Sequence, residues 1–264
     1  MNVGYRRNLG ALVAVVSVVA VMAWALAAEP PAAPKVSTFA PAKDVVSQID
    51  AYMERLQESV KSEEEFKEAE AKLAKDANTM ILLALAAGLH DEDNKYKAAA
   101  PAIFKAAQEL AQAKGFAAAQ AGVAKVKKSP DSSEGNPADL KWVKAASLEE
   151  LMKQVPLVNS RLKRNLRGAN FKKKANSNAG DAATLAVIAQ GSMADTSEAK
   201  NPEEIQKWYG FCVQMRDAAA GLNKAIRAGD QAAAEKAMGA LNQSCDDCHA
   251  VFHKEAPKES GKEE

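Results

Sequence analysis

Ten residues near the C-terminus constrain this chain more than any other stretch, and Ser244 to His253 read SCDDCHAVFH. Cys245 and Cys248 lie three positions apart and His249 lies four from Cys245, so a helix here presents all three side chains on one face. Two thiols on one face can add to the two vinyl groups of a haem, and the adjoining imidazole can bind its iron. The spacing predicts one covalent haem c per chain, with Cys245 and Cys248 as attachment points and His249 as the proximal axial ligand.

Other interpretations of this motif stay open. A redox dithiol normally lies at a strand-to-helix junction, whereas nothing around Cys245 reads as a strand. A zinc site could use Cys245, Cys248 and His253, but a convincing fourth ligand is missing. His249 directly follows Cys248 on the same helix and would have to double back to reach the metal. The two cysteines could also be structural thiols without a cofactor.

The composition favours helices over sheets. Aromatic residues make up 5% of the 264 residues and alanine is abundant, which suits helices better than strands. A chain of this length accommodates one large or two ordinary domains. The net charge is +1 without an extended basic face, which disfavours nucleic acid as a partner. We therefore expect an all-α protein.

The N-terminus carries the signs of export. Arg6 and Arg7 precede an apolar run, Leu9 to Ala28, that ends in small residues. A positive flank, an apolar core and small residues at a cleavage point are typical of a signal peptide. The run is also about as long as a membrane span, so residues 1–28 are either a cleaved signal or an anchor through residues 9–28. We expect a periplasmic protein, soluble or anchored, because c-type haem is attached outside the cytoplasm.

Capping signals and helical periodicity divide the rest of the chain. Ser62 with Glu65, and Ser147 with Glu150, form capping boxes that predict helix starts, and Gly229 predicts the turn before the last helix. Asp76 and Asp181 are expected to begin helices, and 172–180 to form a loop. The expected helices cover 44–60, 63–75, 76–89, 95–114 with a kink or late start at Pro101, 116–127, 147–162 with a kink or restart at Pro156, 181–193, 202–227 and 231–252.

The end of the chain also carries a family resemblance. Ala225 to Glu255, AIRAGDQAAAEKAMGALNQSCDDCHAVFHKE, closely resembles the C-terminal part of cytochromes c′, which are monohaem c-type cytochromes. In that family an Ala-Gly-Asp turn precedes the last helix, and Cys-x-x-Cys-His with an aromatic and a basic residue closes it. Here Phe252 takes the aromatic position and His253 stands where arginine or lysine is usual. The resemblance implies an antiparallel four-helix bundle around the haem.

The first half resembles a second copy of the haem half. Val45 to Val60 aligns with Leu151 to Leu166, and the run from Asp76 aligns with that from Asp181. Opposite the haem motif the alignment places residues that cannot hold a haem, namely Pro130, Ser133 and Glu134. We expect two antiparallel four-helix-type bundles in tandem, forming an intramolecular pseudo-dimer through the helices that start near Val45 and Leu151. The domains are a signal or anchor (1–28), a Pro/Ala-rich linker (29–43), a haem-less bundle (44–128), a linker (129–139), a haem bundle (140–256) and a charged tail (257–264).

The resemblance implies that the sixth position of the iron faces the first helix of the haem bundle. The inward stripe there, Val155, Val158 and Leu162, has no group that binds iron, which predicts an apolar and vacant distal face. Met152 is the possible sixth ligand, one position off this stripe and ahead of Pro156. A vacant face would admit NO or CO, whereas methionine ligation would give an electron carrier.

We therefore expect a cytochrome for one-electron transfer, small-gas binding or both, with redox proteins or gases as partners. The alternative is a structural or partner-docking module in which the haem is accessory. Enzymatic activity is not expected, because a distal His and Arg pair for peroxidase chemistry is not evident. Of the remaining residues, His90 is expected either at the surface or as a histidine that interacts with the dipole at a helix C-terminus, and Cys212 as a buried thiol.

Overall fold

The structure, a computed structural model, describes residues 29–253, and every regular element in this part of the chain is helical. The all-α prediction is confirmed. The predicted signal or anchor and the predicted charged tail lie outside the described residues. Between residues 29 and 253, no helix is both long and apolar enough to cross a membrane.

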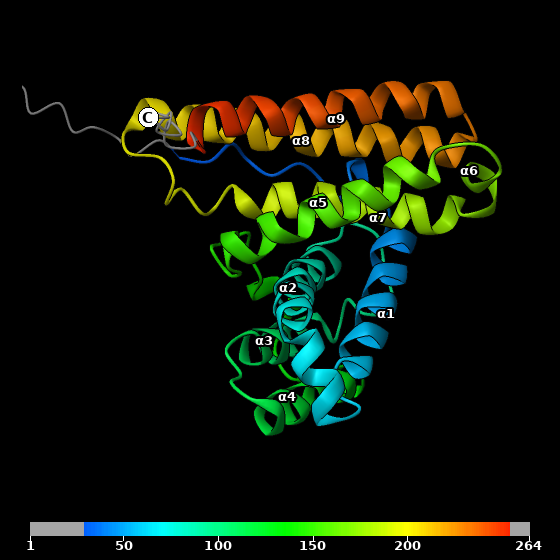
Figure 1. Cartoon of the computed structure of the whole chain (residues 1–264). Coiled ribbons are helices and arrows are strands. Elements are labelled where there is room, and N and C mark those ends of the chain that lie inside the picture. The colour runs from blue at the N-terminus through cyan, green and yellow to red at the C-terminus, as the bar shows by residue number, and fades with distance from the viewer. Residues whose placement is uncertain (1–28, 254–264) are drawn as a thin grey trace, which may run out of the picture.

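Figure 1 shows the helices in two groups, one above the other. The lower group is formed by α1 (Ala42–Glu58), α2 (Glu63–Gly88), α3 (Ala100–Ala111) and α4 (Phe116–Lys128). The upper group is formed by α5 (Leu148–Asn165), the short α6 (Ala169–Lys173), α7 (Ala175–Ser192), α8 (Pro202–Ala228) and α9 (Gln231–Phe252). Short 3-10 turns at Val36–Thr38, Ser129–Asp131 and Pro137–Asp139 lie in the connections.

Helix starts fall where the capping signals predict them. The Ser62 hydroxyl accepts from the Glu65 N–H at 3.1 Å, and the Ser147 hydroxyl accepts from the Glu150 N–H at 3.3 Å. Both bonds satisfy donors that the first helical turn leaves free. Gly229 ends α8 with a φ of +70°, a left-handed conformation that glycine adopts without a steric penalty.

The prediction that Asp76 and Asp181 begin helices is wrong, because α2 and α7 continue through them. Each carboxylate is buried and bonded to an arginine of the preceding long helix. Arg55 donates to Asp76 at 3.0 Å, and Arg161 donates to Asp181 through two bonds of 2.7 Å. A buried carboxylate needs such a cation, so these aspartates pair across helices instead of capping them.

The loop predicted at 172–180 is also wrong over most of its length, since α6 ends at Lys173 and α7 begins at Ala175. Asn178, which suggested a loop, is fully buried in α7 and accepts a hydrogen bond from Asn165 at 3.1 Å. Likewise, α5 runs through Pro156 without restarting, whereas the late start predicted at Pro101 is confirmed by α3.

The segment predicted as a linker at 29–43 packs its second part against the helices. Phe39 is 2% exposed and Ala40 is fully buried. The Phe39 ring lies 6.5 Å from the Trp142 ring, centre to centre, and the Arg216 guanidinium lies 5.8 Å from the same ring. The entry to α1 is therefore fixed against the C-terminal half.

The two halves meet where α1 lies on α7, and where α2 lies on α5 and α7. Gly191 of α7 permits a close approach, because a Cβ there would lie 2.6 Å from a Leu82 methyl group of α2. Gln154 donates to the Tyr52 hydroxyl at 2.7 Å and so joins α5 to α1. The contact between the halves thus combines close helix packing with buried hydrogen bonds.

Candidate functional site

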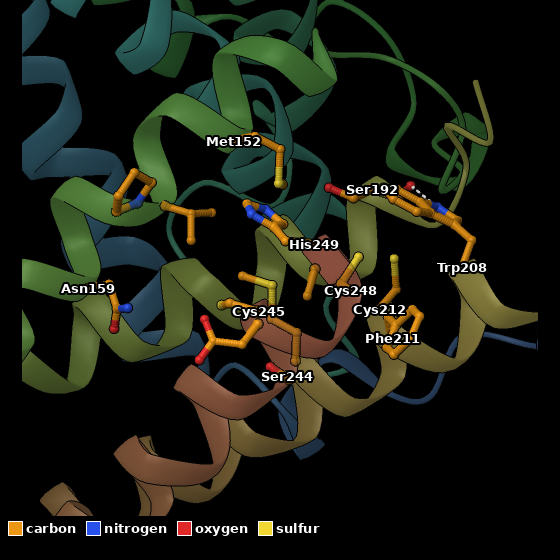
Figure 2. Close-up of a pocket in the computed structure, with 15 residues that line it drawn as sticks. Met152, Asn159, Ser192, Trp208, Phe211, Cys212, Ser244, Cys245, Cys248 and His249 are labelled. Atoms are coloured by element: carbon orange, nitrogen blue, oxygen red, sulfur yellow. Dashed lines mark hydrogen bonds between the residues drawn. The ribbon is translucent and has the colours of Figure 1, made fainter. Parts of the chain in front are cut away.

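A cavity of about 210 Å³ lies among α5, α7, α8 and α9 (Figure 2). An adjoining cavity of about 430 Å³ opens toward the end of α9 and shares four of the same lining residues, Met152, Trp208, Cys248 and His249. The lining of the first cavity consists of Met152, Val155, Pro156 and Asn159 of α5, Ala189 and Ser192 of α7, Trp208, Phe211, Cys212 and Met215 of α8, and Ser244, Cys245, Asp246, Cys248 and His249 of α9.

The motif lies on α9 as the spacing predicts. Asp230 caps this helix by accepting from the Ala233 N–H at 2.9 Å, and the helix continues without a break to Phe252. Cys245, Cys248 and His249 therefore share one helical face and all line the first cavity. The two thiols are half-buried, whereas the His249 ring is exposed to solvent on one side of the cavity.

Aromatic contacts hold the end of α9 against α8. The Phe252 ring lies 5.4 Å from the Trp208 ring and 6.1 Å from the Phe211 ring, both in edge-to-face geometry. Trp208 donates its indole N–H to the Ser192 carbonyl at 3.1 Å, which ties α8 to the end of α7. Such pairs contribute beyond the apolar area that they bury, so the motif lies on a firmly packed helix.

The surroundings of the thiols favour their protonated form. Burial raises the pKa of the Cys248 thiol to about 11, and it also raises the pKa of Cys245 and of Cys212. A redox-active Cys-x-x-Cys has the opposite property, because a lowered thiol pKa supplies its nucleophilic thiolate. All three cysteines are free thiols, and Cys212 is buried as expected.

For the zinc interpretation, the residues from 29 to 253 contain no cluster of three or more Cys, His, Asp or Glu side chains arranged to hold a metal ion. His249 and His253 lie with their ring centres 5.6 Å apart at the end of α9. His253 lines the adjoining cavity and not the first one.

The residues of α5 that form the cavity wall opposite α9 differ from those that the sequence predicted. Val158 and Leu162 are fully buried but do not line the cavity, and only Val155 of the expected stripe does so. The helix has a second face at helical spacing, formed by Met152, Val155, Pro156 and Asn159, and this face borders the cavity. In Figure 2 the Met152 thioether and the His249 ring point toward the same space from opposite helices.

The reason for the difference lies in the N-terminal half. The stripe with Val158 and Leu162 belongs to the side of α5 that packs on α2 and α7, where Gln154 bonds to Tyr52. The sequence predicted that this helix both meets the first half and faces the iron, and the same apolar stripe was expected to serve the iron. One stripe cannot cover both, and Val158 and Leu162 are buried away from the cavity. Met152 therefore lies on the cavity face without any rotation of its turn.

His90 and the residues of the first half that align with the motif lie outside the cavity. His90 is 2% exposed, so the surface alternative is wrong, whereas its place directly after the C-cap of α2 agrees with the other alternative. One ring nitrogen bonds to the Ala40 carbonyl at 3.0 Å, and the other accepts from the Glu92 N–H at 3.0 Å. In the first half, α4 ends at Lys128, ahead of the residues aligned with the motif.

Sequence reasoning missed the contribution of α8. Trp208, Phe211, Cys212 and Met215 have the spacing of one helical face, and all four line the cavity. That spacing is visible in the sequence and indicates an apolar wall. Ser192 and Asn159 gave no such signal, because single polar residues on a helix are ordinarily at the surface.

Comparisons of the chain with protein-family models, with curated proteins and with solved structures find no match. The residues themselves test whether a haem fits. Two thiols and an imidazole on one helical face meet a predominantly apolar cavity, and a thioether lies on the facing wall. This donor set agrees with the ligands of c-type haem.

Proposed function

We propose that the chain is an exported monohaem c-type cytochrome similar to cytochromes c′, with haem c attached to Cys245 and Cys248 and with His249 as the proximal ligand. The observation that carries the proposal is that these three side chains line one wall of a predominantly apolar cavity. Apolar cavities with a few convergent polar groups are the usual form of cofactor sites. When bound, the haem supplies an iron that changes oxidation state by one electron.

The chain's own residues would hold this group in three ways. Cys245 and Cys248 would fix its edge to α9, and the imidazole of His249 would fix the iron on the α9 side. Trp208 and Phe211 would cover it with aromatic surface and exclude water, which tunes the iron potential. The proposed architecture is two four-helix bundles in tandem, α1 to α4 without haem and α5, α7, α8 and α9 with it.

Met152 is the proposed sixth ligand, and one-electron transfer is the proposed activity. Its thioether lies on the wall that faces α9 and lines both cavities together with His249. Methionine paired with histidine is a ligand set of electron-carrying cytochromes. The predicted vacant apolar face depended on Val158 and Leu162, which lie elsewhere.

Pro156 bears on how firmly Met152 is held. It lies four residues after Met152 within α5 and has no N–H, so the Met152 carbonyl lacks its helical hydrogen bond. A ligand on such a turn can leave the iron more easily than one in an intact helix. Binding of a small neutral gas is therefore the second proposed activity, by displacement of Met152.

The attachment is tested by the mass and the spectrum of the chain expressed with c-type haem maturation. One haem retained through denaturation is expected for the parent, and none for the Cys245→Ala, Cys248→Ala double variant. Cys212→Ala is the matched control, because it removes a thiol from the same cavity and should keep the haem. Two haems per chain, or loss of haem in the control alone, contradicts the proposal.

The sixth ligand is tested by absorption spectra of the reduced protein before and after CO. A low-spin spectrum that becomes high-spin in Met152→Ala supports ligation, and Met215→Ala should leave it unchanged although Met215 lines the same cavity from α8. If the parent protein is already high-spin and binds CO fully, its sixth position is vacant and the protein is a gas binder. Equal effects of both variants would exclude Met152 as the ligand.

A further inference from the structure

Two residues that line the cavity have a buried polar atom without a hydrogen-bond partner among the described residues, namely the Ser192 hydroxyl and the Oδ1 of Asn159. The Asn159 oxygen can only accept, and its amide nitrogen already donates to Asn242 at 2.9 Å, so the Ser192 hydroxyl is the one of the two that can donate. Ser192, the last residue of α7, is 3% exposed, and its buried hydroxyl makes no hydrogen bond within the part of the chain that the structure describes. It lines the first cavity, and its backbone is held because its carbonyl accepts from the Trp208 indole. Figure 2 shows the residue on the same side of the cavity as Met152. The hydroxyl is therefore a free donor in an apolar space.

This state is unusual for a serine in a helix. The common partner is the carbonyl four residues earlier, and Thr184 of the same helix makes that bond to the Gly180 carbonyl at 3.0 Å. Ser192 does not make it, and its buried hydroxyl loses hydration without compensation. A bound ligand that accepts a hydrogen bond from this hydroxyl would explain why a buried polar group is kept at this position.

The surroundings define the ligand's chemistry. The lining of the first cavity contains neither lysine nor arginine, and the one charged side chain is that of Asp246. A carboxylate or another anion there would lose its hydration without a cation to replace it, and Asp246 would repel it. A haem propionate is thus a poor partner for Ser192. A neutral molecule with a weak acceptor atom carries no such penalty.

We propose that the Ser192 hydroxyl donates a hydrogen bond to the outer atom of a neutral diatomic ligand, such as NO or CO, that occupies the cavity on the side away from α9. The inference deepens the gas binding proposed above and rests on that proposal. Ser192 is then a positioning residue that distinguishes ligands by the acceptor strength of their outer atom. The apolar side chains that α5 and α8 contribute to the lining give no such preference.

The test uses the haem-loaded full chain with Met152→Ala, so that the sixth position is open, and CO as the probe. A donor near the outer atom of bound CO lowers the C–O stretching frequency, because it draws electron density from the metal into the antibonding orbital. Adding Ser192→Ala should raise that frequency and speed CO dissociation about fivefold, the effect of one ordinary hydrogen bond. Ser192→Thr keeps a hydroxyl and should restore both values.

Ser244→Ala is the matched control. Ser244 lines the same cavity and is 5% exposed, but its hydroxyl already donates to the Leu241 carbonyl at 2.8 Å. It should leave the C–O frequency unchanged and lower the thermal stability, whereas Ser192→Ala should not lower it. If Ser192→Ala leaves the C–O frequency unchanged, or costs as much stability as Ser244→Ala, the inference is overturned. A chain without covalent haem gives no CO spectrum at all, and that result refutes the proposed function instead.

Discussion

Asp44 is the residue whose removal should weaken the contact between the two halves most clearly. It lies on α1, is fully buried, and accepts hydrogen bonds from two residues of α8. Asn223 donates to it at 2.8 Å, and Arg227 donates through Nε at 3.3 Å and through a second, short bond from Nη2. The carboxylate therefore links α1 to the C-terminal half.

The expected loss of stability in Asp44→Ala depends on the hydrogen bonds that its two partners retain. Removing one member of a buried ion pair costs about 3–5 kcal/mol when the other charge is left without compensation. The Arg227 side chain is 24% exposed and keeps a bond to Asn176 at 2.6 Å, and Asn223 keeps its bond to the Ala179 carbonyl at 2.7 Å. We therefore expect a loss of about 2–3 kcal/mol, less than the full penalty.

The assay is thermal unfolding followed by circular dichroism, with Asp50→Ala as the matched control. For a protein of this size that loss corresponds to a melting temperature lower by about 5–10 °C. Asp50 is also on α1 and accepts from Lys95 at 2.9 Å and from the Tyr96 hydroxyl, but within the first half and with 42% of its side chain exposed, so a smaller loss of about 1 kcal/mol is expected. Equal losses in the two variants would refute the role given to Asp44.

Further predictions concern the thiols, the paired aspartates and the glycine of the contact. In haem-free protein, iodoacetamide should modify Cys248 slowly at pH 8 and faster toward pH 11, since burial raises its pKa to about 11; fast reaction at pH 8 contradicts this. Burial also raises the pKa of Asp76, so the stability that this group contributes falls as the pH rises above the pKa of the unfolded chain. Asp76→Asn does not titrate, so its free energy of unfolding in urea should increase relative to that of the parent between pH 4 and 7. Asp181→Asn, which breaks two bonds of 2.7 Å to Arg161, should instead lower the free energy of unfolding by about 2–4 kcal/mol at pH 7. A loss smaller than that of Asp76→Asn would contradict this. Gly191→Ala should cost about 1–3 kcal/mol by overpacking, whereas Gly239→Ala, in open space on α9, should gain about 0.5–1 kcal/mol; similar melting temperatures would contradict the close approach.

Local signals in the sequence predicted the helix starts and the motif because each depends on residues a few positions apart. The caps at Ser62 and Ser147 form within one turn, and so does the alignment of Cys245, Cys248 and His249 on one face of α9. The free energy of such features is decided mainly by neighbouring residues. They therefore persist whatever the rest of the chain does.

Long-range pairing produced the errors. Asp76 has the local appearance of a cap, but it lies inside α2, where its buried carboxylate is bonded to Arg55 of another helix. Asp181 fails for the same reason. The aligned pairs Arg55–Asp76 and Arg161–Asp181 make the same kind of contact in the two halves. A pairing of this kind is visible only when the two helices are placed side by side.

The two faces of α5 join these long-range effects to the candidate site. One face packs on the first half through Val158 and Leu162, so the other face brings Met152 and Pro156 to the cavity. Because Pro156 removes the helical bond to the Met152 carbonyl, Pro156→Ala should restore it and hold Met152 more firmly. One recovered hydrogen bond predicts about fivefold weaker CO binding to the reduced protein, together with a higher melting temperature. Leu157→Ala, at an exposed neighbouring position that is 49% accessible, changes no backbone donor and should leave CO binding as it is. A Pro156→Ala protein that gains stability but binds CO as the parent does would show that the turn does not control Met152.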